Sequence, residues 1–180
     1  MILHNFSLKQ VILASFFAGL TAIGAFLIIP FYPVPMTLQT LFTLLSGMLL
    51  GKKAGFLSQL IYVSLGLIGL PVFSGGKAGF GVLFGPTGGY LIGFIISAYL
   101  IGFILEKMGK KQIYHYILAG SLGVIAIDLI GVAQLAIVMQ ITIQSAFVIG
   151  VFPFLVSDCI KIIAATLIAS KLKLALKEML

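Results

Sequence analysis

Long apolar runs, separated by short groups of glycine, proline and lysine, dominate this chain. Most of the runs approach the roughly 20 apolar residues that a helix needs to cross a bilayer. Only 8% of the residues are charged, against about 25% in soluble domains. The sequence therefore predicts an all-α integral membrane protein, a single domain over residues 1–180 with six transmembrane helices. The six predicted spans are 8–29, 36–51, 54–70, 85–106, 113–139 and 151–171.

Lysine placement predicts the orientation of these helices. Six alternating spans place nine of the eleven lysines on one side of the membrane, which the positive-inside rule makes cytoplasmic, with both termini. Because topology explains this charge and the chain has no arginine, we expect no nucleic-acid partner. The two lysines that topology leaves unexplained are Lys77 and Lys161. The nine are Lys9, Lys52, Lys53, Lys107, Lys110, Lys111, Lys171, Lys173 and Lys177.

A charged pair interrupts the last apolar run. Asp158 and Lys161 lie three residues apart, so a helix places both on one face. An ionisable residue near the centre of a membrane helix costs roughly 2.5–3.5 kcal/mol on insertion scales, and such residues usually mark a site. We expect the pair to bind a ligand; an ion pair that only fixes helix packing is the alternative. The sequence leaves Asp128 open: it pairs with Lys161, is protonated, lines the site or is structural.

Two glycine-rich segments face each other in the predicted topology. Residues 72–79 contain the run Ser-Gly-Gly-Lys-Ala-Gly at 74–79, a composition that suits a mobile lid over an outward-facing cavity. Residues 85–90 read Gly-Pro-Thr-Gly-Gly-Tyr and open the fourth span, where glycine exposes backbone amides to a ligand and Tyr90 offers a ring. We assign this end of the span to the site. Packing explains the deeper glycines equally well.

Small residues recur every four positions in the first span, at Ala14, Ala18 and Ala22. In lipid, such a stripe lets a second helix approach closely. Docking of a partner protein and packing inside the bundle both account for the pattern.

Several chemistries have no basis in the sequence. No GxxxxGK[ST] motif is present, so we do not expect the chain to hydrolyse nucleotides. The single cysteine, Cys159, excludes a multi-cysteine metal site. We expect no cofactor and no metal, and any energy must come from a partner or a gradient.

Four ordered motifs carry a resemblance to a known family. They read PVPMTLQT at residues 33–40, VFSGGKAG at 72–79, GPTGGYLIGF at 85–94 and PFLVSDCIK at 153–161. Together they resemble the BioY family, the biotin-specific S components of energy-coupling factor (ECF) transporters. Relatives often have asparagine at the lid position that Lys77 occupies here, so Lys77 is a departure, and its charge suits a carboxylate.

The resemblance implies a biotin-binding subunit in a prokaryotic cell membrane, surrounded by lipid and not an enzyme. It implies docking through Ala14, Ala18 and Ala22 onto a transmembrane coupling subunit that carries two ATPase subunits. Asp158 suits the ureido N–H donors of biotin and Lys161 the ureido oxygen. The expected ligand-binding residues are Asp158, Lys161, Lys77, Gln39, Tyr90 and Thr87.

Three other functions stay open. The chain can be a solitary biotin transporter that acts as a homo-oligomer. It can serve a different vitamin, since one fold hosts many substrates. It can also be an intramembrane enzyme with Asp128 and Asp158 as paired acids, although no nucleophile or metal cluster accompanies them.

Overall fold

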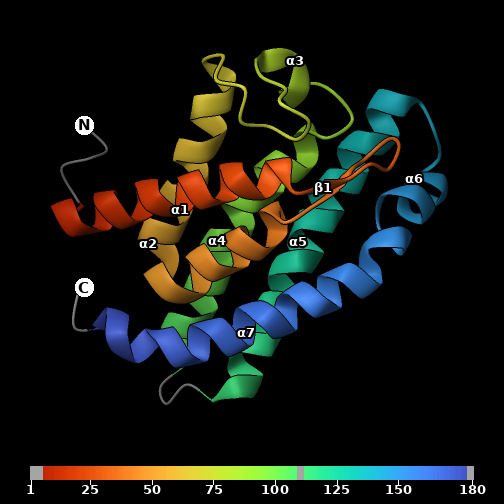
Figure 1. Ribbon diagram of the computed structural model, residues 1–180. Coiled ribbons are helices and arrows are strands. Elements are labelled where there is room, and N and C mark those ends of the chain that lie inside the picture. The colour runs from red at the N-terminus through yellow and green to blue at the C-terminus, as the bar shows by residue number, and fades with distance from the viewer. Residues whose placement is uncertain (1–5, 109–111, 178–180) are drawn as a thin grey trace.

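Helices make up most of the computed structural model, which describes residues 6–108 and 112–177 (Figure 1). Two strands of two residues each, β1 (Ile28–Ile29) and β2 (Met36–Thr37), pair antiparallel between the first two helices. The prediction of a helical protein is confirmed. The short two-stranded ribbon was not predicted. The helices are α1 (Leu8–Phe26), α2 (Gln39–Leu67), α3 (Phe80–Leu83), α4 (Gly88–Lys107), α5 (Ile113–Met139), α6 (Ile143–Gly150) and α7 (Leu155–Lys177).

The helices match the predicted spans unevenly. Within the described residues, four segments are long and apolar enough to cross a membrane: Leu8–Phe26, Gly88–Lys107, Ile113–Met139 and Ile143–Leu172. The last combines α6, a 3₁₀ turn and the first part of α7, so the predicted outer connection around 142–150 is largely helical. The predicted second and third spans are the two arms of α2. The total of six spans therefore stays a prediction.

A break at Gly51 divides α2 into these two arms. Gly51 has φ 78° and ψ −178°, a backbone conformation that is essentially restricted to glycine. The Glu106 carboxylate holds the bend, because it accepts from the Lys52 backbone N–H at 2.9 Å and lies 2.9 Å from Lys52 Nζ. The sequence suggested a loop between two spans here, whereas one glycine turns the chain without a loop.

The start of α1, the end of α7 and the bend in α2 lie toward one end of the molecule. The start of α1 and the end of α7 are on the same side in Figure 1. Lys52 and Lys107 converge on the ring of Phe103, at 5.7 and 4.5 Å from its centroid. This arrangement agrees with lysines clustered on one side, and the cytoplasmic assignment stays a prediction. Lys110 and Lys111 lie outside the described residues.

Glycines let α4 pack closely against its neighbours. A Cβ at Gly89 would lie 2.5 Å from the Ile130 carbonyl oxygen, and one at Gly93 would lie 2.8 Å from Ile127 Cα. Both contacts are with α5, so the glycines of α4 serve helix packing, as expected in lipid. On another face, α4 packs against α2, which in turn packs against α1.

A buried polar network ties α1 to both arms of α2. The Gln59 amide nitrogen lies within hydrogen-bond distance of the hydroxyls of Thr21 (3.2 Å), Ser46 (3.3 Å) and Ser58 (3.2 Å), and Thr43 donates to the Gln59 oxygen at 3.2 Å. All five side chains are fully buried or nearly so. The network fixes the angle of the bent helix that carries one wall of the site.

Candidate functional site

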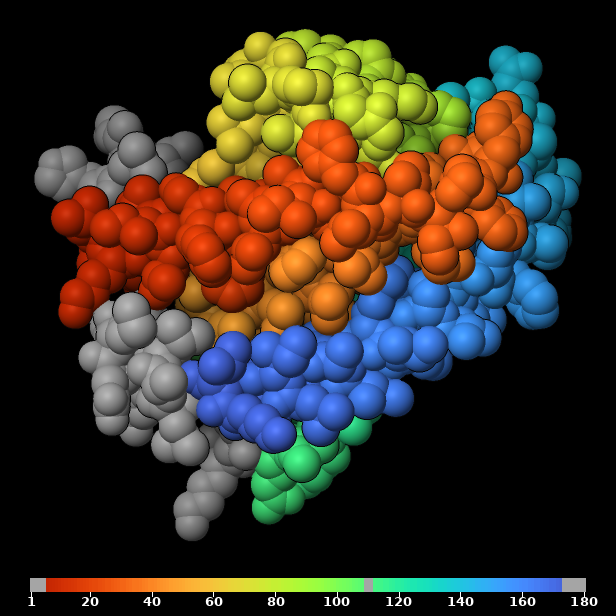
Figure 2. Space-filling model, in the orientation of Figure 1, coloured from red at the N-terminus to blue at the C-terminus, as the bar shows by residue number. Residues whose placement is uncertain are grey.

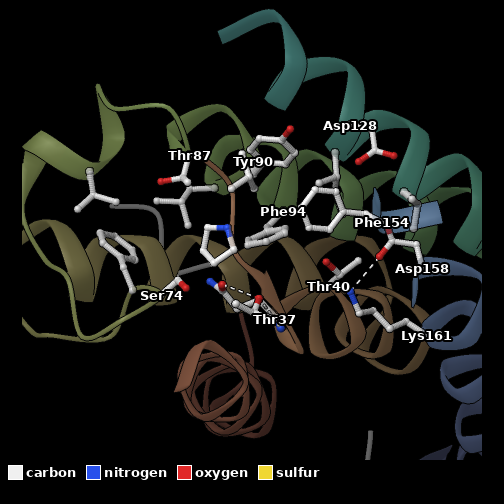
Figure 3. Close-up of a pocket in the computed structure, with 18 of the residues that line it drawn as sticks. Thr37, Thr40, Ser74, Thr87, Tyr90, Phe94, Asp128, Phe154, Asp158 and Lys161 are labelled. Atoms are coloured by element: carbon white, nitrogen blue, oxygen red, sulfur yellow. Dashed lines mark hydrogen bonds and ion pairs between the residues drawn. The ribbon is translucent and has the colours of Figure 1, made fainter. Parts of the chain in front are cut away.

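A cavity lies where the loops of the bundle meet the first turns of α4 and α7 and the middle of α5 (Figure 3). Its empty volume is about 760 Å³, including space open to solvent. The structure brings together every residue that the sequence assigned to ligand binding; binding itself stays a prediction. Those residues are Gln39, Lys77, Thr87, Tyr90, Asp158 and Lys161.

The charged pair of α7 forms part of the cavity wall. Lys161 Nζ donates to Asp158 Oδ1 at 3.0 Å, and both side chains are largely buried, with exposures of 7% and 11% respectively. Because both residues belong to one helix, the bond does not join α7 to a neighbouring helix. An ion pair that fixes helix packing therefore finds little support, whereas the space beside the pair favours a role in binding.

The lid (residues 72–79) closes one side of the cavity. It folds back on itself through a bridge in which the Phe73 N–H donates to the Lys77 carbonyl at 3.0 Å. The Phe73 side chain is buried against Tyr62, with ring centroids 5.7 Å apart. Lys77 is exposed and lines the mouth, and the Ser74 hydroxyl oxygen is buried without a hydrogen-bond partner among the described residues.

A chain of hydrogen bonds joins the lid to the junction of β2 and α2. The Thr37 hydroxyl donates to Gln39 Oε1 at 2.8 Å, Gln39 Nε2 donates to the Tyr62 hydroxyl at 2.5 Å, and that hydroxyl donates to the Val72 carbonyl at 3.1 Å. Gln39 lines the cavity, whereas Tyr62 lies behind it. Through the Tyr62 hydroxyl, the backbone of the lid at Val72 is therefore linked to the Gln39 side chain in the cavity.

The start of α4 contributes side chains to the cavity. One of its backbone amides is used in the turn, because the Gly88 N–H donates to the Gly85 carbonyl at 3.2 Å, and a Cβ at Gly88 would collide with Leu83. Access of a ligand to the other amides stays a prediction. Thr87 lines the cavity, and Tyr90 presents its ring while its hydroxyl donates to the Gly150 carbonyl at 2.9 Å.

Several lining residues were not predicted. Ser, Thr and Phe are too common in membrane helices and loops to mark a site by themselves, and only their positions in the fold reveal them. Asp128, whose role the sequence left open, also lines the cavity. The other unassigned residues include Thr37, Thr40, Ser74, Phe94 and Phe154.

The charged groups of the cavity gather at one end. Figure 3 shows Ser74 and Thr87 on one side of Phe94, and Asp128, Asp158 and Lys161 on the other, with Thr37 and Thr40 between them. Aromatic and aliphatic side chains, among them Tyr90, Phe94 and Leu91, also line the cavity. The arrangement suits an elongated, partly apolar molecule with polar groups at both ends.

The alanine stripe of α1 lies inside the molecule. Ala14 and Ala18 are 0% and 1% exposed, and Ala22 is half-buried, on the face of α1 that packs against α2. Partner docking through these methyl groups is therefore not supported, and they serve the internal packing that was the alternative. Figure 2 shows α1 at the surface along its length, where the exposed small residues are Ser15 and Gly19.

Comparisons with known proteins agree on one family. The family model described as BioY family matches residues 2–178. The chain is 45% identical to the biotin transporter BioY of Thermotoga maritima, covering 92% of this chain and 96% of that one. It is 41% identical to a probable biotin transporter BioY of Pyrococcus horikoshii, again over 92% of this chain and 96% of the relative.

A solved structure has a similar fold. The S-component for biotin from an ECF-type ABC transporter superposes with a TM-score of 0.86 and 33% identity, covering 92% of this chain and 90% of that chain. The likeness therefore extends over nearly the whole of both chains.

Proposed function

The chain belongs to the BioY family, and from this membership we propose that it is the biotin-binding S component of an ECF-type transporter. Relatives carry the name of biotin transporters, a role that involves no enzymatic step. The whole chain, residues 1–180, acts as one domain in the cell membrane of a prokaryote. The observation that carries the proposal is the cavity, which has charged residues at one end, Ser74 and Thr87 at the other, and aromatic side chains along it.

The Asp158 end of the cavity suits the ureido ring of biotin. A ureido group has two N–H donors and one strong acceptor oxygen, so it needs acceptors and a donor. Asp158 accepts from an N–H, and Lys161 donates to the oxygen. Tyr90 and Phe94 then pack against the fused bicycle, since aromatic side chains bury large apolar area.

The lid end suits the carboxylate of the valerate tail. Lys77 supplies a positive charge at the mouth, and the unpartnered Ser74 hydroxyl and Thr87 supply hydrogen bonds. An ammonium beside a carboxylate is favourable, although an exposed pair contributes little. The tail is therefore the weaker of the two contacts.

Lys77→Met should weaken biotin binding about twofold to fivefold, because an exposed ion pair is worth little and salt screens it. Affinity for biotin amide, which lacks the carboxylate charge, should not change. Calorimetry at low and high salt measures both effects. Lys107→Met, at the far end of α4, is the matched control. Equal loss for biotin and its amide would show that Lys77 does not contact the carboxylate.

Tyr62→Phe should speed biotin release roughly fivefold or more, because it leaves Gln39 and the Val72 carbonyl without their partner. The ring contact with Phe73 is retained, so the lid should loosen without unfolding. Release of radiolabelled biotin from the purified protein measures the rate. Tyr99→Phe, whose ring stacks on Phe103 away from the cavity, is the control. An unchanged release rate would show that the position of the lid does not control biotin release.

The biotin assignment has a direct test. The protein is purified from cells grown with biotin, denatured, and the released small molecules are weighed by mass spectrometry. A tight vitamin binder should release biotin in near-equal molar amount. Calorimetry with biotin and, as a control, thiamine then measures selectivity. Release of another vitamin, or of none together with no binding of added biotin, would refute the assignment.

ECF partners supply the energy in this proposal. A coupling transmembrane subunit with two ATPase subunits docks on the open face of α1, where Ser15 and Gly19 are exposed and a Cβ at Gly19 meets nothing within 4 Å. Biotin uptake in cells with and without an ECF module tests the requirement. Equal uptake without the module would favour the solitary homo-oligomeric transporter.

A further inference from the structure

Asp128 brings a second carboxylate into the cavity. It lies midway along α5 and lines the same cavity as Asp158 and Lys161. Figure 3 shows it on the α5 side of the charged end, with Asp158 and Lys161 on α7. The three residues are close enough for their charges to interact. Among the described residues, Asp128 makes no hydrogen bond and no ion pair.

A purely structural role for Asp128 lacks a partner. An acidic side chain in an apolar helix is costly, and a structural one is normally bonded to a neighbouring helix. Gln134, on the same helix, shows what such a bond looks like: its amide donates to the carbonyls of Leu83 and Gly85 at 2.6 and 2.9 Å. Asp128 has no such link, so its oxygens remain available to a molecule in the cavity.

The shape of the ureido edge requires more than one acceptor. In a five-membered cyclic urea, the carbonyl lies between the two N–H bonds, and these point away from each other. One carboxylate therefore does not accept both N–H bonds while a lysine donates to the oxygen between them. The edge needs an acceptor, a donor and a second acceptor, in that order.

The α7 pair alone supplies only part of this pattern. Asp158 Oδ1 already accepts from Lys161 Nζ at 3.0 Å, which leaves its other oxygen for one N–H. Lys161 retains further donor capacity for the ureido oxygen. A second acceptor is missing from α7, and Asp128 on α5 brings one to the same end of the cavity.

We infer that Asp128 is a third ring-binding residue, a role that rests on the proposed biotin function. Asp158 and Asp128 each accept one ureido N–H, and Lys161 donates to the oxygen between them. The set makes the site specific for a cyclic urea with both N–H groups intact. Ring analogues that lack either donor should be rejected, because a carboxylate would then be buried without a partner.

Substitutions at Asp128 test the acceptor directly. Asp128→Leu has the same branching but no acceptor, and it should weaken biotin binding roughly tenfold. Asp128→Asn keeps one acceptor oxygen and should lose less. Ser121→Leu, on the same helix but outside the cavity, is the control and should bind biotin as the parent does. Calorimetry on detergent-purified protein gives the affinities, and thermal unfolding reports folding.

A pair of biotin analogues identifies which N–H meets Asp128. Each analogue is a lactam in which one ureido N–H is replaced by CH₂. The parent protein should bind both lactams at least fivefold more weakly than biotin. In Asp128→Leu, one of the two replacements should cost nothing further, because its acceptor is already gone.

These measurements separate failure of the inference from failure of the function. If the parent binds biotin tightly and Asp128→Leu binds it within twofold of the parent, the inference is overturned and the function stands. If Asp128→Leu does not fold, the lactam measurements on the unsubstituted protein provide the test. Equal affinity of that protein for biotin and for either lactam overturns the inference. If the parent binds no biotin at all, the proposed function fails, and the inference with it.

Discussion

Lys161→Met should reduce biotin affinity at least tenfold, and Asp158→Asn should have a similar effect. Removal of one partner leaves the other buried in an apolar helix, at a cost that reaches about 3–5 kcal/mol when the remaining group stays charged. The same change removes a proposed contact with the biotin ring, so affinity falls in addition to stability. Calorimetry on the purified variants measures the loss.

Lys171→Met is the control on the same helix, because Lys171 is exposed and does not line the cavity. Thermal unfolding should show all three variants folded. Unchanged biotin affinity in both Lys161→Met and Asp158→Asn would mean that the pair does not bind the vitamin.

Gly51→Ala should lower the free energy of unfolding by about 1–3 kcal/mol, the range for a residue forced into a conformation reserved for glycine. Space is also limited, because a Cβ at Gly51 would lie 2.8 Å from Glu106 Oε1. A straighter α2 would pull its two arms out of their packing against α4. Chemical or thermal unfolding in detergent measures the loss.

Gly19→Ala is the matched control for this substitution. Gly19 lies inside α1, and a Cβ there meets nothing within 4 Å, so alanine should be neutral or slightly stabilising. If the two variants unfold at the same midpoint, the bend at Gly51 does not carry the stability assigned to it.

The sequence predicted the helices best where apolar runs were long and sharply bounded. The predicted span 113–139 has the bounds of α5, whereas 36–51 and 54–70 are one helix bent at Gly51. A glycine followed by two lysines reads equally well as a loop or as a bend, and only packing against α4 distinguishes them. α6 was missed because its eight residues are too short to stand out within a connection.

The charged residues of the site were predictable because charge inside an apolar run is expensive and therefore informative. Asp158 and Lys161 stood out on that ground alone. Tyr62 did not, because its role depends on two bonds, to Gln39 and to Val72, that exist only after α2 and the lid come together. The alanines of α1 were conspicuous in the sequence, but their role was not predictable. A stripe of small residues indicates close packing without showing whether the neighbouring helix belongs to the same chain or to a partner.

The unequal depth of the two lysines has a consequence for what the protein can take up. Lys77 is exposed and Lys161 is buried, so in the proposed site biotin should enter ring first, with its carboxylate toward the lid. Biotin joined to a protein through an amide lacks the carboxylate charge, and the attached protein is too bulky for the opening of the cavity. We therefore expect the site to bind free biotin and to exclude such conjugates.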